Sequence, residues 1–328
     1  MENQNLQALE VRARRGLLDV AAEKDYYRYK QGFVGELDFL ALLEEFQLSH
    51  YQRVHDLALD YQGKCQIDLL LIYEEVIYLL EIKNYFGRFD YSAKGQCLLG
   101  GQALGEDIVS GVRRRALKLG HLLDQGGLGH FQIQPVLAFV NPFCQVGTLE
   151  LVPSDLVVVS RCEIPAWIQS IQKARHRRVS LKDYQDLLSL FQRYRDSTSY
   201  LPPLIEVLPF GKMKRGLFCP HCRRGLERVG KIYSQCQTCG QRLHKADLLD
   251  LACSDLALLA HHNPRILTRP NLKGLVGSTV GETYIHRHLK EHYQAHGQTR
   301  QRYYTFLPER SPIRTFTTAD LEALRKYW

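Results

Sequence analysis

Two apolar runs separated by a short polar break stand out in the pattern of hydrophobic and polar positions. Residues 67–73 and 76–83 are rich in β-branched and aromatic side chains, and Glu74-Glu75 lies between them. Such runs are typical of strands buried on at least one face, and a two-residue break predicts that they form a β-hairpin. Further apolar runs predict strands at 53–60, 132–140 and 156–160 and a second hairpin from 88–91 and 96–99.

The predicted hairpin brings three charged side chains to one patch. If Tyr73 pairs with Val76, Asp68 lies directly opposite Glu81, with Cβ atoms about 4.5–5.5 Å apart. Because strand side chains alternate between faces, Lys83 points the same way as Glu81. Two neighbouring carboxylates repel each other unless a cation lies between them.

The chemistry of this patch has two interpretations. Carboxylate oxygens suit Mg²⁺, and such an ion can bind a phosphate oxygen and activate a water nucleophile. Lys83 would then orient that water or stabilise the developing negative charge. The alternative is an ion pair at the end of a strand, in which Lys83 only neutralises Glu81.

Helical spacing of apolar residues follows from Phe33 to Phe46 and predicts a helix over 33–46. Glu36 lies on or beside the buried face of this helix, where a carboxylate needs a partner. The alternative is a carboxylate at the edge of the helix that reaches water. The same kind of spacing predicts helices at 5–30, 107–123, 165–171, 181–194, 248–260, 271–275, 281–293 and 317–326.

The helix predicted at 107–123 has a strongly basic face. Arg113, Arg114, Arg115 and Lys118 lie opposite its apolar residues. Such a run is often a solvated face, and beside a nuclease site it can instead contact backbone phosphates. We therefore consider Arg113, Arg114 and Lys118 as candidate nucleic-acid-binding residues.

Several of these motifs together resemble a known family. Asp68, followed after twelve residues by Glu81-Ile82-Lys83, is similar to the core of the PD-(D/E)XK nuclease superfamily. The upstream segment 32–36, which ends in Gly35-Glu36, and Gly87-Arg88-Phe89 downstream make the resemblance more specific. With them, residues from about 30 to 170 resemble the nuclease-related domain, or NERD, family.

This resemblance implies a fold and a set of roles. The fold would be α/β, a restriction-endonuclease-like mixed sheet flanked by helices. Glu36, Asp68 and Glu81 would hold Mg²⁺ or Mn²⁺, and Lys83 would position or activate the water. The implied activity is hydrolysis of phosphodiester bonds in nucleic acid, DNA in the first place. The alternative is a module that keeps the nuclease fold and binds nucleic acid or protein without cutting.

Paired cysteines form a second motif. Cys219-x-x-Cys222 and Cys236-x-x-Cys239 are thirteen residues apart, with a predicted strand at 230–234 between them. Two such pairs can close a tetrahedral thiolate site around Zn²⁺, as in a zinc ribbon. Four thiolates complete the coordination shell, so the predicted zinc site is structural.

The helices and strand predicted after residue 245 resemble a winged helix-turn-helix module. In that arrangement Arg287 and Lys290 of the helix at 281–293 would lie toward a DNA groove. A small helical bundle packed on the ribbon explains the sequence as well. We therefore expect a mainly helical C-terminal domain, with DNA binding as one of its two interpretations.

Composition agrees with this organisation. A chain of 328 residues exceeds one comfortable core, and a formal net charge of +8 favours polyanionic partners. No apolar run reaches the length of a membrane span, no signal core follows Met1, and an odd set of nine cysteines fits a reducing cytoplasm. The oligomeric state stays open, a homodimer included. The expected parts are a helical lead-in at 1–29, a NERD nuclease-like domain at 30–175, a helix and linker at 176–212, a zinc ribbon at 213–245, and a helical domain at 246–328.

Overall fold

The computed structural model describes residues 3–149, 152–175, 177–196, 202, 205–261 and 263–327. The chain divides into two compact units. We call Gln31–Ser199 the sheet unit, and Met1–Lys30 together with Tyr200–Trp328 the helical unit. The division falls within one continuous helix, α2 (Val20–Glu45).

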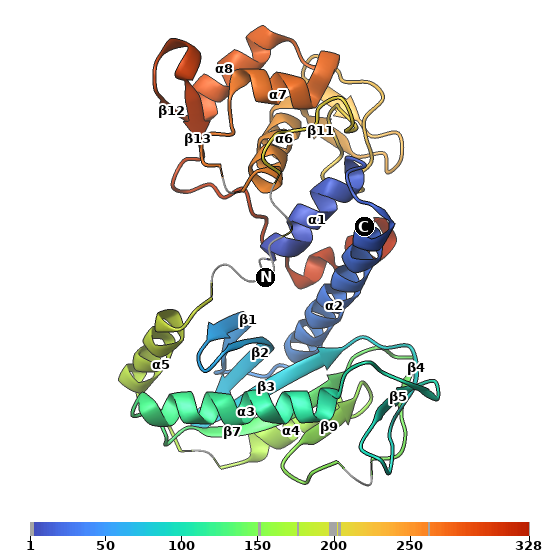
Figure 1. Ribbon diagram of the computed structural model, residues 1–328, viewed down its shortest axis with the longest axis vertical. Coiled ribbons are helices and arrows are strands. Elements are labelled where there is room, and N and C mark those ends of the chain that lie inside the picture. Colours follow the sequence, from blue (N-terminus) through green and yellow to red (C-terminus); the bar gives the residue numbers. More distant parts are fainter. Residues whose placement is uncertain are drawn as a thin grey trace. The chain divides into compact units, whose positions relative to one another are not determined.

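A five-stranded mixed sheet forms the centre of the sheet unit (Figure 1). Its strand order is β1-β2-β3-β7-β9, in which the first three strands are antiparallel and the last two run parallel to β3. The mixed sheet with its flanking helices confirms the predicted fold class. The strands are β1 (Gln52–Asp60), β2 (Lys64–Tyr73), β3 (Val76–Lys83), β7 (Gln132–Phe139) and β9 (Val157–Ser160).

Helices cover both faces of this sheet, as the alternation of β3 side chains shows. Ile77 and Leu79 pack with α3 (Ile108–Gln125) in one apolar core. Tyr78, which points to the other face, meets Trp167 of α4 (Ile164–Lys173) edge to face at 5.6 Å. This burial on both sides explains why β3 is almost continuously apolar.

The central hairpin has the predicted register. Tyr73 pairs with Val76, and the pairing continues without a bulge to Leu69 and Leu80. Glu74 takes a left-handed backbone conformation with φ 52°, which closes the tight turn. The pairing of Tyr73 with Val76 confirms the predicted register, and the ladder ends one residue before Asp68 and Glu81.

Smaller elements complete the sheet unit. A second, four-stranded sheet has the order β6-β5-β4-β8, and its β4–β5 hairpin confirms the second predicted hairpin. Helix α5 (Leu181–Arg193) begins with a capping box between Ser180 and Asp183 and packs into the core that also contains α3. The small strands are β4 (Gly87–Tyr91), β5 (Cys97–Leu99), β6 (Gln102–Ala103) and β8 (Cys144–Val146).

The helical unit gathers segments from both ends of the chain around one core. Val11 of α1 (Gln4–Arg14) is fully buried together with Leu249 and Leu256 of α6 (Lys245–Leu259). The remaining elements are β10 (Tyr233–Gln235), β11 (Arg242–His244), α7 (Arg269–Val276), α8 (Glu282–His292), β12 (Gln294–His296), β13 (Tyr303–Thr305) and α9 (Leu321–Tyr327), with 3₁₀ turns at Gly277–Thr279, Thr299–Gln301 and Thr318–Asp320.

The prediction of one helix over 5–30 is wrong. Helix α1 ends at Arg14, and Gly16 follows with φ 70°, a conformation that favours glycine and ends a helix. Helix α2 then runs as one element from Val20 to Glu45, so the boundary expected near residue 33 does not exist. The predicted linker at 197–203 lies outside the described residues, apart from Pro202.

Candidate functional site

Three neighbouring strands of the sheet unit place carboxylates in one row. In the β1–β2 ladder, His55 pairs with Leu69 and Leu57 with Ile67, so Asp56 lies opposite Asp68. The β2–β3 ladder ends at Leu69 and Leu80, and its register continued by one residue puts Asp68 beside Glu81, where the Asp68 carboxylate accepts a hydrogen bond from the amide of Ile82. Side chains that face each other across antiparallel strands have Cβ atoms about 5 Å apart, so three carboxylates lie side by side.

A fourth carboxylate comes from α2, because Gly35 lets this helix approach the end of the hairpin. A Cβ atom on Gly35 would lie 2.8 Å from the Cβ of Asn84, closer than real contacts allow. The close approach places Glu36 near the carboxylates of the strands. Burial first, and then the charges of Asp68 and Asp56, raise the pKa of Glu36 well above its ordinary value.

Asp68 lies in the middle of this cluster and is held by the backbone. Its Oδ2 accepts a hydrogen bond of 2.9 Å from the amide of Ile82. Burial and the neighbouring charge of Glu81 raise the pKa of Asp68 to about 7 against the opposing influence of Lys83 and the Ile82 amide. The ordinary pKa of an aspartate is 3.8. The raised value means that ionisation of Asp68 is unfavourable in the metal-free site.

Two cations hold the carboxylate of Glu81, which is 7 % exposed. The Nζ atom of Lys83 lies 2.8 Å from Oε1, and Arg115 of α3 pairs with Oε2. Although burial alone favours the neutral amine, the charge of Glu81 raises the pKa of Lys83. The ion pair between Lys83 and Glu81 that the alternative interpretation expected is therefore present.

We call Glu36, Asp56, Asp68 and Glu81, with Lys83 and Arg115, the carboxylate cluster. The cluster contains four acidic and two basic side chains. Its formal net charge is therefore −2, which one divalent cation would neutralise. Their oxygen atoms are the ligands that Mg²⁺ accepts, so the donor set fits such an ion. The carboxylates do not approach one another as closely as metal ligands do, since among the described residues only the four cysteines have their ligand atoms within 4.8 Å of one another.

The prediction from sequence missed Asp56 and Arg115 as members of this cluster. The signal for Asp56 was present: Gly63 closes the turn between two predicted strands, and pairing Asp60 with Lys64 across it places Asp56 opposite Asp68. Arg115 was recognised as part of a basic face. Its contact with Glu81 depends on how α3 is rotated against the sheet, which no local pattern determines.

The other basic residues of α3 are engaged in different ways. The Nε atom of Arg113 lies 3.1 Å from Asp155, and Lys118 donates a hydrogen bond of 2.9 Å to the carbonyl of Gly63. The side chain of Arg114 is exposed. A role of these three residues in phosphate binding stays a prediction.

The four cysteines of the helical unit form the second candidate site. Cys219 and Cys239 have their Sγ atoms 3.7 Å apart, and Cys222 and Cys236 have theirs 3.5 Å apart. Although burial opposes ionisation, the amides of Cys239 and Thr238 lower the pKa of Cys236 to about 7, which favours a thiolate ligand.

The geometry around these cysteines suits a structural metal such as zinc. Gly240, with φ 72°, allows the tight turn of the second knuckle. The antiparallel β10–β11 ribbon pairs Tyr233 with His244 directly beside it. Four sulfur ligands from two knuckles are the donor set of a closed zinc site.

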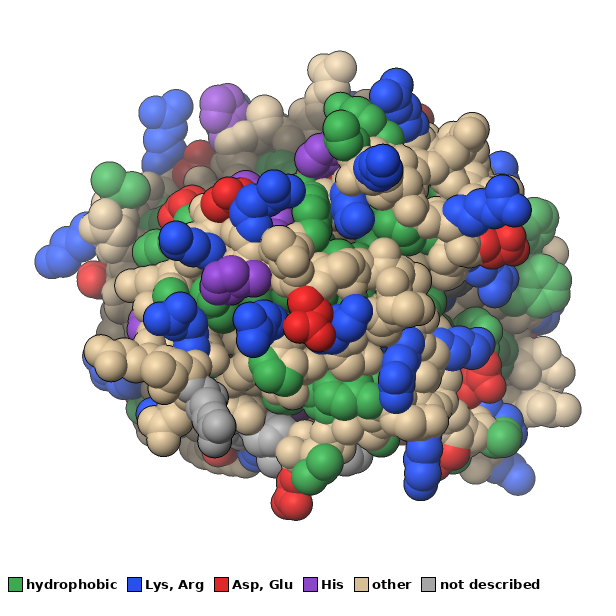
Figure 2. Space-filling model, turned by 90° about the horizontal axis from the view of Figure 1, so that it is seen from above, with side chains coloured by type: hydrophobic (Ala, Val, Ile, Leu, Met, Phe, Trp, Pro, Cys, Tyr) green, Lys and Arg blue, Asp and Glu red, His purple; other side chains and the backbone are tan. Residues whose placement is uncertain are grey.

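Helices α6, α7 and α8 are followed by an antiparallel hairpin of β12 and β13. Ile285 and Leu289 of α8 are fully buried, whereas Thr283, Arg287 and Lys290 share its exposed face. Lys and Arg side chains are spread over the face shown in Figure 2, with Asp and Glu side chains among them. The exposed face of α8 thus offers two basic side chains, Arg287 and Lys290.

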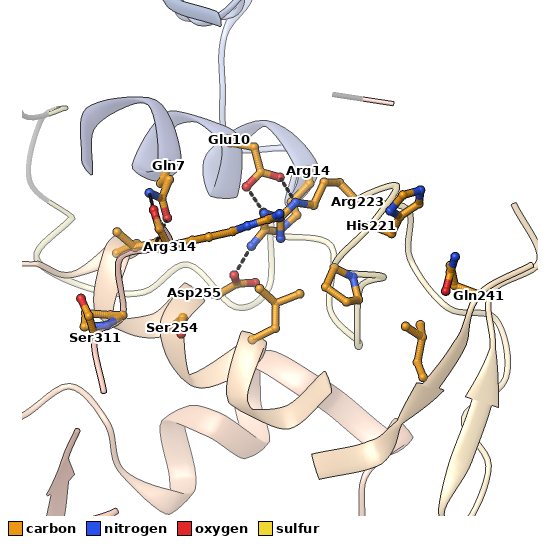
Figure 3. A pocket seen from close by; sticks show the side chains of 15 residues that line it. Gln7, Glu10, Arg14, His221, Arg223, Gln241, Ser254, Asp255, Ser311 and Arg314 are labelled. Atoms are coloured by element: carbon orange, nitrogen blue, oxygen red, sulfur yellow. Dashed lines mark hydrogen bonds and ion pairs between the residues drawn. The ribbon is translucent and has the colours of Figure 1, made fainter. Parts of the chain in front are cut away.

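A cavity of about 440 Å³ in the helical unit is lined by part of a buried ion-pair network, namely Glu10, Arg14, Arg223 and Asp255 (Figure 3). Arg14 pairs with both Glu10 and Asp255, and the Nη2 atom of Arg15 lies 2.5 Å from Asp255. Arg223 approaches Glu10 at 3.7 Å. We call these five residues the arginine cluster, and it connects α1 to α6 and to the first cysteine knuckle.

Comparison with known proteins agrees with this geometry. The mixed sheet between helices, with Asp, Glu and Lys at the end of its central hairpin, defines a nuclease-like α/β unit. Residues 31–140 match the family model of the nuclease-related domain, which confirms the resemblance predicted from the motifs. No curated protein and no solved structure matches the chain significantly. Among the described helices, none is long and apolar enough to cross a membrane.

Proposed function

We propose that this protein is a nuclease that hydrolyses phosphodiester bonds of nucleic acid with Mg²⁺ or Mn²⁺. The observation that carries the proposal is the cluster of Asp68, Glu81 and Lys83 with Glu36, at the end of a hairpin within the segment that matches the nuclease-related domain. Its surplus of negative charge favours a divalent cation. Away from water, in a buried site, such a surplus is costly without a compensating cation.

Each residue has a role in this proposal. Glu36, Asp68 and Glu81 would hold the ion, which supplies a Lewis acid for the phosphate and lowers the pKa of a bound water. Lys83 lies beside Glu81 and would orient the attacking water or stabilise negative charge on the phosphate. The amide of Ile82 fixes the Asp68 carboxylate, so this ligand is oriented before the ion binds.

Nucleic acid is the proposed partner, DNA in the first place. The exposed Arg287 and Lys290 lie on one face of α8, in a helix order that resembles a winged helix-turn-helix module. Arg113, Arg114 and Lys118 of α3 are further candidates for phosphate contacts. We also propose that the cysteines bind one structural Zn²⁺, and the reduced thiols that this requires suit the cytoplasm.

One observation favours a second candidate function, a module that binds nucleic acid without cutting it. Arg115 and Lys83 both hold Glu81, and this pairing competes with a cation for the carboxylate. In a catalytic site the ion must therefore displace Arg115 or bind beside the pair. In a binding module, Arg115 and Lys83 would both stay paired with Glu81.

Cleavage of labelled nucleic acid by the purified full chain tests the proposal. Duplex DNA, single-stranded DNA and RNA are incubated with Mg²⁺, with Mn²⁺ or with a chelator. We expect cleavage of at least one substrate with metal and none with chelator or with Asp68→Asn. The matched control is Asp60→Asn, an exposed residue at the end of β1. Binding without cleavage under every metal condition would favour the non-catalytic module.

A further inference from the structure

We propose that Phe86 and Phe143 form a stacking platform for an unpaired nucleobase beside the carboxylate cluster, so that the substrate is single-stranded next to the bond that is cut. We call these two residues the phenylalanine pair. The inference rests on the nuclease function proposed above and deepens it, because it names a substrate class that the carboxylates and Lys83 leave open. Neither phenylalanine belongs to the motif that resembles the nuclease superfamily.

The two rings are exposed side by side. Phe86 is 74 % exposed and Phe143 is 69 % exposed, and their ring centroids lie 6.1 Å apart with the planes at 50°. Among the described residues no other phenylalanine is exposed. Single exposed apolar side chains are ordinary, whereas contiguous ones mark interaction sites. The phenylalanine pair is therefore a candidate contact surface.

The backbone holds both rings in place. Phe86 directly precedes β4, and Phe143 directly precedes β8. These strands are parallel, and their first residues, Gly87 and Cys144, form a pair. The amide of Gly87 donates a hydrogen bond of 3.2 Å to the carbonyl of Phe143, whose own amide donates one of 3.0 Å to the side chain of Asn141. Because paired strands lie about 4.8 Å apart, the two side chains stand next to each other without a bound ligand.

The phenylalanine pair lies at the same edge of the sheet as Lys83. The parallel strands β3 and β7 end with the pair Lys83 and Phe139, and the chain continues from there to Phe86 and Phe143. Three residues span at most about 11 Å, so Phe86 stays close to Lys83. Tyr85, the residue before Phe86, has its ring centroid 6.0 Å from the Nζ atom of Lys83. A strand with a phosphate at Lys83 reaches the pair within a few nucleotides, because stacked nucleotides are about 3.4 Å apart.

Size and chemistry favour a nucleobase over a protein surface as the occupant. Every base has a flat face that can stack on an aromatic ring, whatever the sequence. Two phenyl side chains bury at most about 500 Å², less than the roughly 800 Å² that each partner contributes to a standard protein interface. In a duplex the bases already stack on one another, and a base must be unstacked before it can bind elsewhere. A strand with unpaired bases avoids this cost.

Binding of short single-stranded and duplex DNA tests the inference without cleavage, because no divalent cation is added. The zinc-loaded full chain is compared with a double variant, Phe86→Ala with Phe143→Ala, and with Leu181→Ala. Leu181 is also 74 % exposed and begins α5, across the sheet unit from β4 (Figure 1). We expect the double variant to bind single strands at least about 5-fold more weakly, the lower end of the loss when a stacking aromatic becomes alanine. It should bind duplex DNA as the wild type does, and Leu181→Ala should bind both as the wild type does.

Two further measurements separate stacking from other contacts. The salt dependence of single-strand binding should keep its slope in the double variant, because no phosphate contact is lost. Exchange of both phenylalanines for Trp should keep single-strand binding, whereas exchange for Leu keeps apolar side chains without rings and should weaken it. This second exchange also replaces the alanine variant if that variant unfolds at a lower temperature. Wild-type binding in the folded Leu variant, or an equal loss for single strands and duplex, would overturn the inference.

Cleavage assays separate the inference from the function on which it rests. If single-strand binding depends on the phenylalanine pair but the wild type cuts nothing with Mg²⁺ or Mn²⁺, the platform stands and the nuclease proposal is wrong. If the wild type cuts and the alanine variant binds and cuts equally well, the inference is wrong and the nuclease proposal stands. An alanine variant that loses self-association and keeps single-strand binding would make the pair a contact between copies of the chain, which also overturns the inference.

Discussion

The sheet unit and the helical unit each bury a cluster of charged side chains, and the two clusters differ in their balance. In the arginine cluster, Arg14 and Arg15 contact both oxygens of Asp255, and Arg14 also pairs with Glu10. Arg223 adds one further positive charge beside Glu10. The carboxylate cluster contains four acidic and two basic side chains, and both basic side chains form ion pairs with Glu81.

This difference favours a structural role for the arginine cluster and supports the proposed ion-binding role of the carboxylate cluster. Burial of charge is tolerated when each group has a partner, and removal of one partner from such a network is costly. Burial first, and then the like charges of neighbouring acids, raise the pKa of Glu36 and of Asp68. Perturbed groups of this kind concentrate at functional sites. The cluster in which oppositely charged groups pair with one another therefore connects elements, and the one that gathers like charges is suited to bind an ion.

The largest expected effect concerns zinc, which belongs to the structural side of the comparison. Cys236→Ser removes a thiolate ligand and should release the bound zinc, whose binding free energy in such sites is about 10 kcal/mol or more. Metal analysis of anaerobically purified protein should find one zinc in the wild-type chain and less in the variant. The Mg²⁺ requirement of cleavage should not change. Equal zinc content in both proteins would contradict the proposed ligand set.

Asp255→Ala should break the arginine cluster. The substitution leaves Arg14 and Arg15 buried without their common partner, so we expect a loss of about 3–5 kcal/mol in the free energy of unfolding. Denaturant unfolding of the full chain measures this loss. Asp247→Ala, an exposed acid in the first turn of the same helix, is the control. Similar stabilities of the two variants would show that the cluster does not connect α1 to α6.

Lys83→Ala should show the opposite behaviour, with a large effect on activity and a small one on stability. Loss of one stabilising charge at a reacting phosphate costs about 3 kcal/mol, or roughly 100-fold in cleavage rate. Initial rates at saturating Mg²⁺ test this expectation. Because Arg115 still pairs with Glu81 in the variant, the fold should be kept. Wild-type rates in a folded variant would contradict the proposed role of Lys83.

The smallest expected effect concerns the exposed basic residues of α8. Changing Arg287 and Lys290 together to Gln should weaken DNA binding uniformly across sequences and reduce the salt slope by about 2, one for each lost phosphate contact. Binding measured at several salt concentrations gives the slope. In the control, Lys231 and Arg242 are changed to Gln. These two residues are also exposed and lie on the ribbon segment. An unchanged slope in the α8 variant would remove this helix from the DNA interface.

Local features of the fold could be predicted from the sequence because they depend on neighbouring residues. The turn at Glu74-Glu75 determines the hairpin register, and the two cysteine pairs determine their own cluster. Glu36 was recognised through Gly35 and the helical spacing after it. These predictions need no information on distant parts of the chain.

Features that depend on packing between distant segments could not be predicted in the same way. The polar residues at 24–31 concealed the continuity of α2, and the burial of Val11 against α6 joins the two ends of the chain. The pairing of Arg115 with Glu81 requires the rotation of α3 on the sheet. Asp56 differs from these cases, because its opposition to Asp68 follows from a turn that the sequence already indicates.

The pH dependence of thermal unfolding tests the central claim, that the carboxylate cluster is built for a divalent cation. In metal-free protein the folded Asp68 has a pKa of about 7 against an ordinary value of 3.8, so the folded state binds more protons between these values. The contribution of Asp68 to the free energy of unfolding must then fall as the pH rises from about 4 to 7. Asp68→Asn should remove part of this loss and be the more stable protein at pH 8.

Mg²⁺ should restore the stability that is lost. For the zinc-loaded full chain, we predict that Mg²⁺ at 100 times its Kd stabilises the wild type by about 2.7 kcal/mol at pH 8. The effect should be much smaller at pH 5, where Asp68 is protonated, and small in Asp68→Asn at both pH values. The contradicting result is equal stabilisation of wild type and variant, or none in the wild type at pH 8.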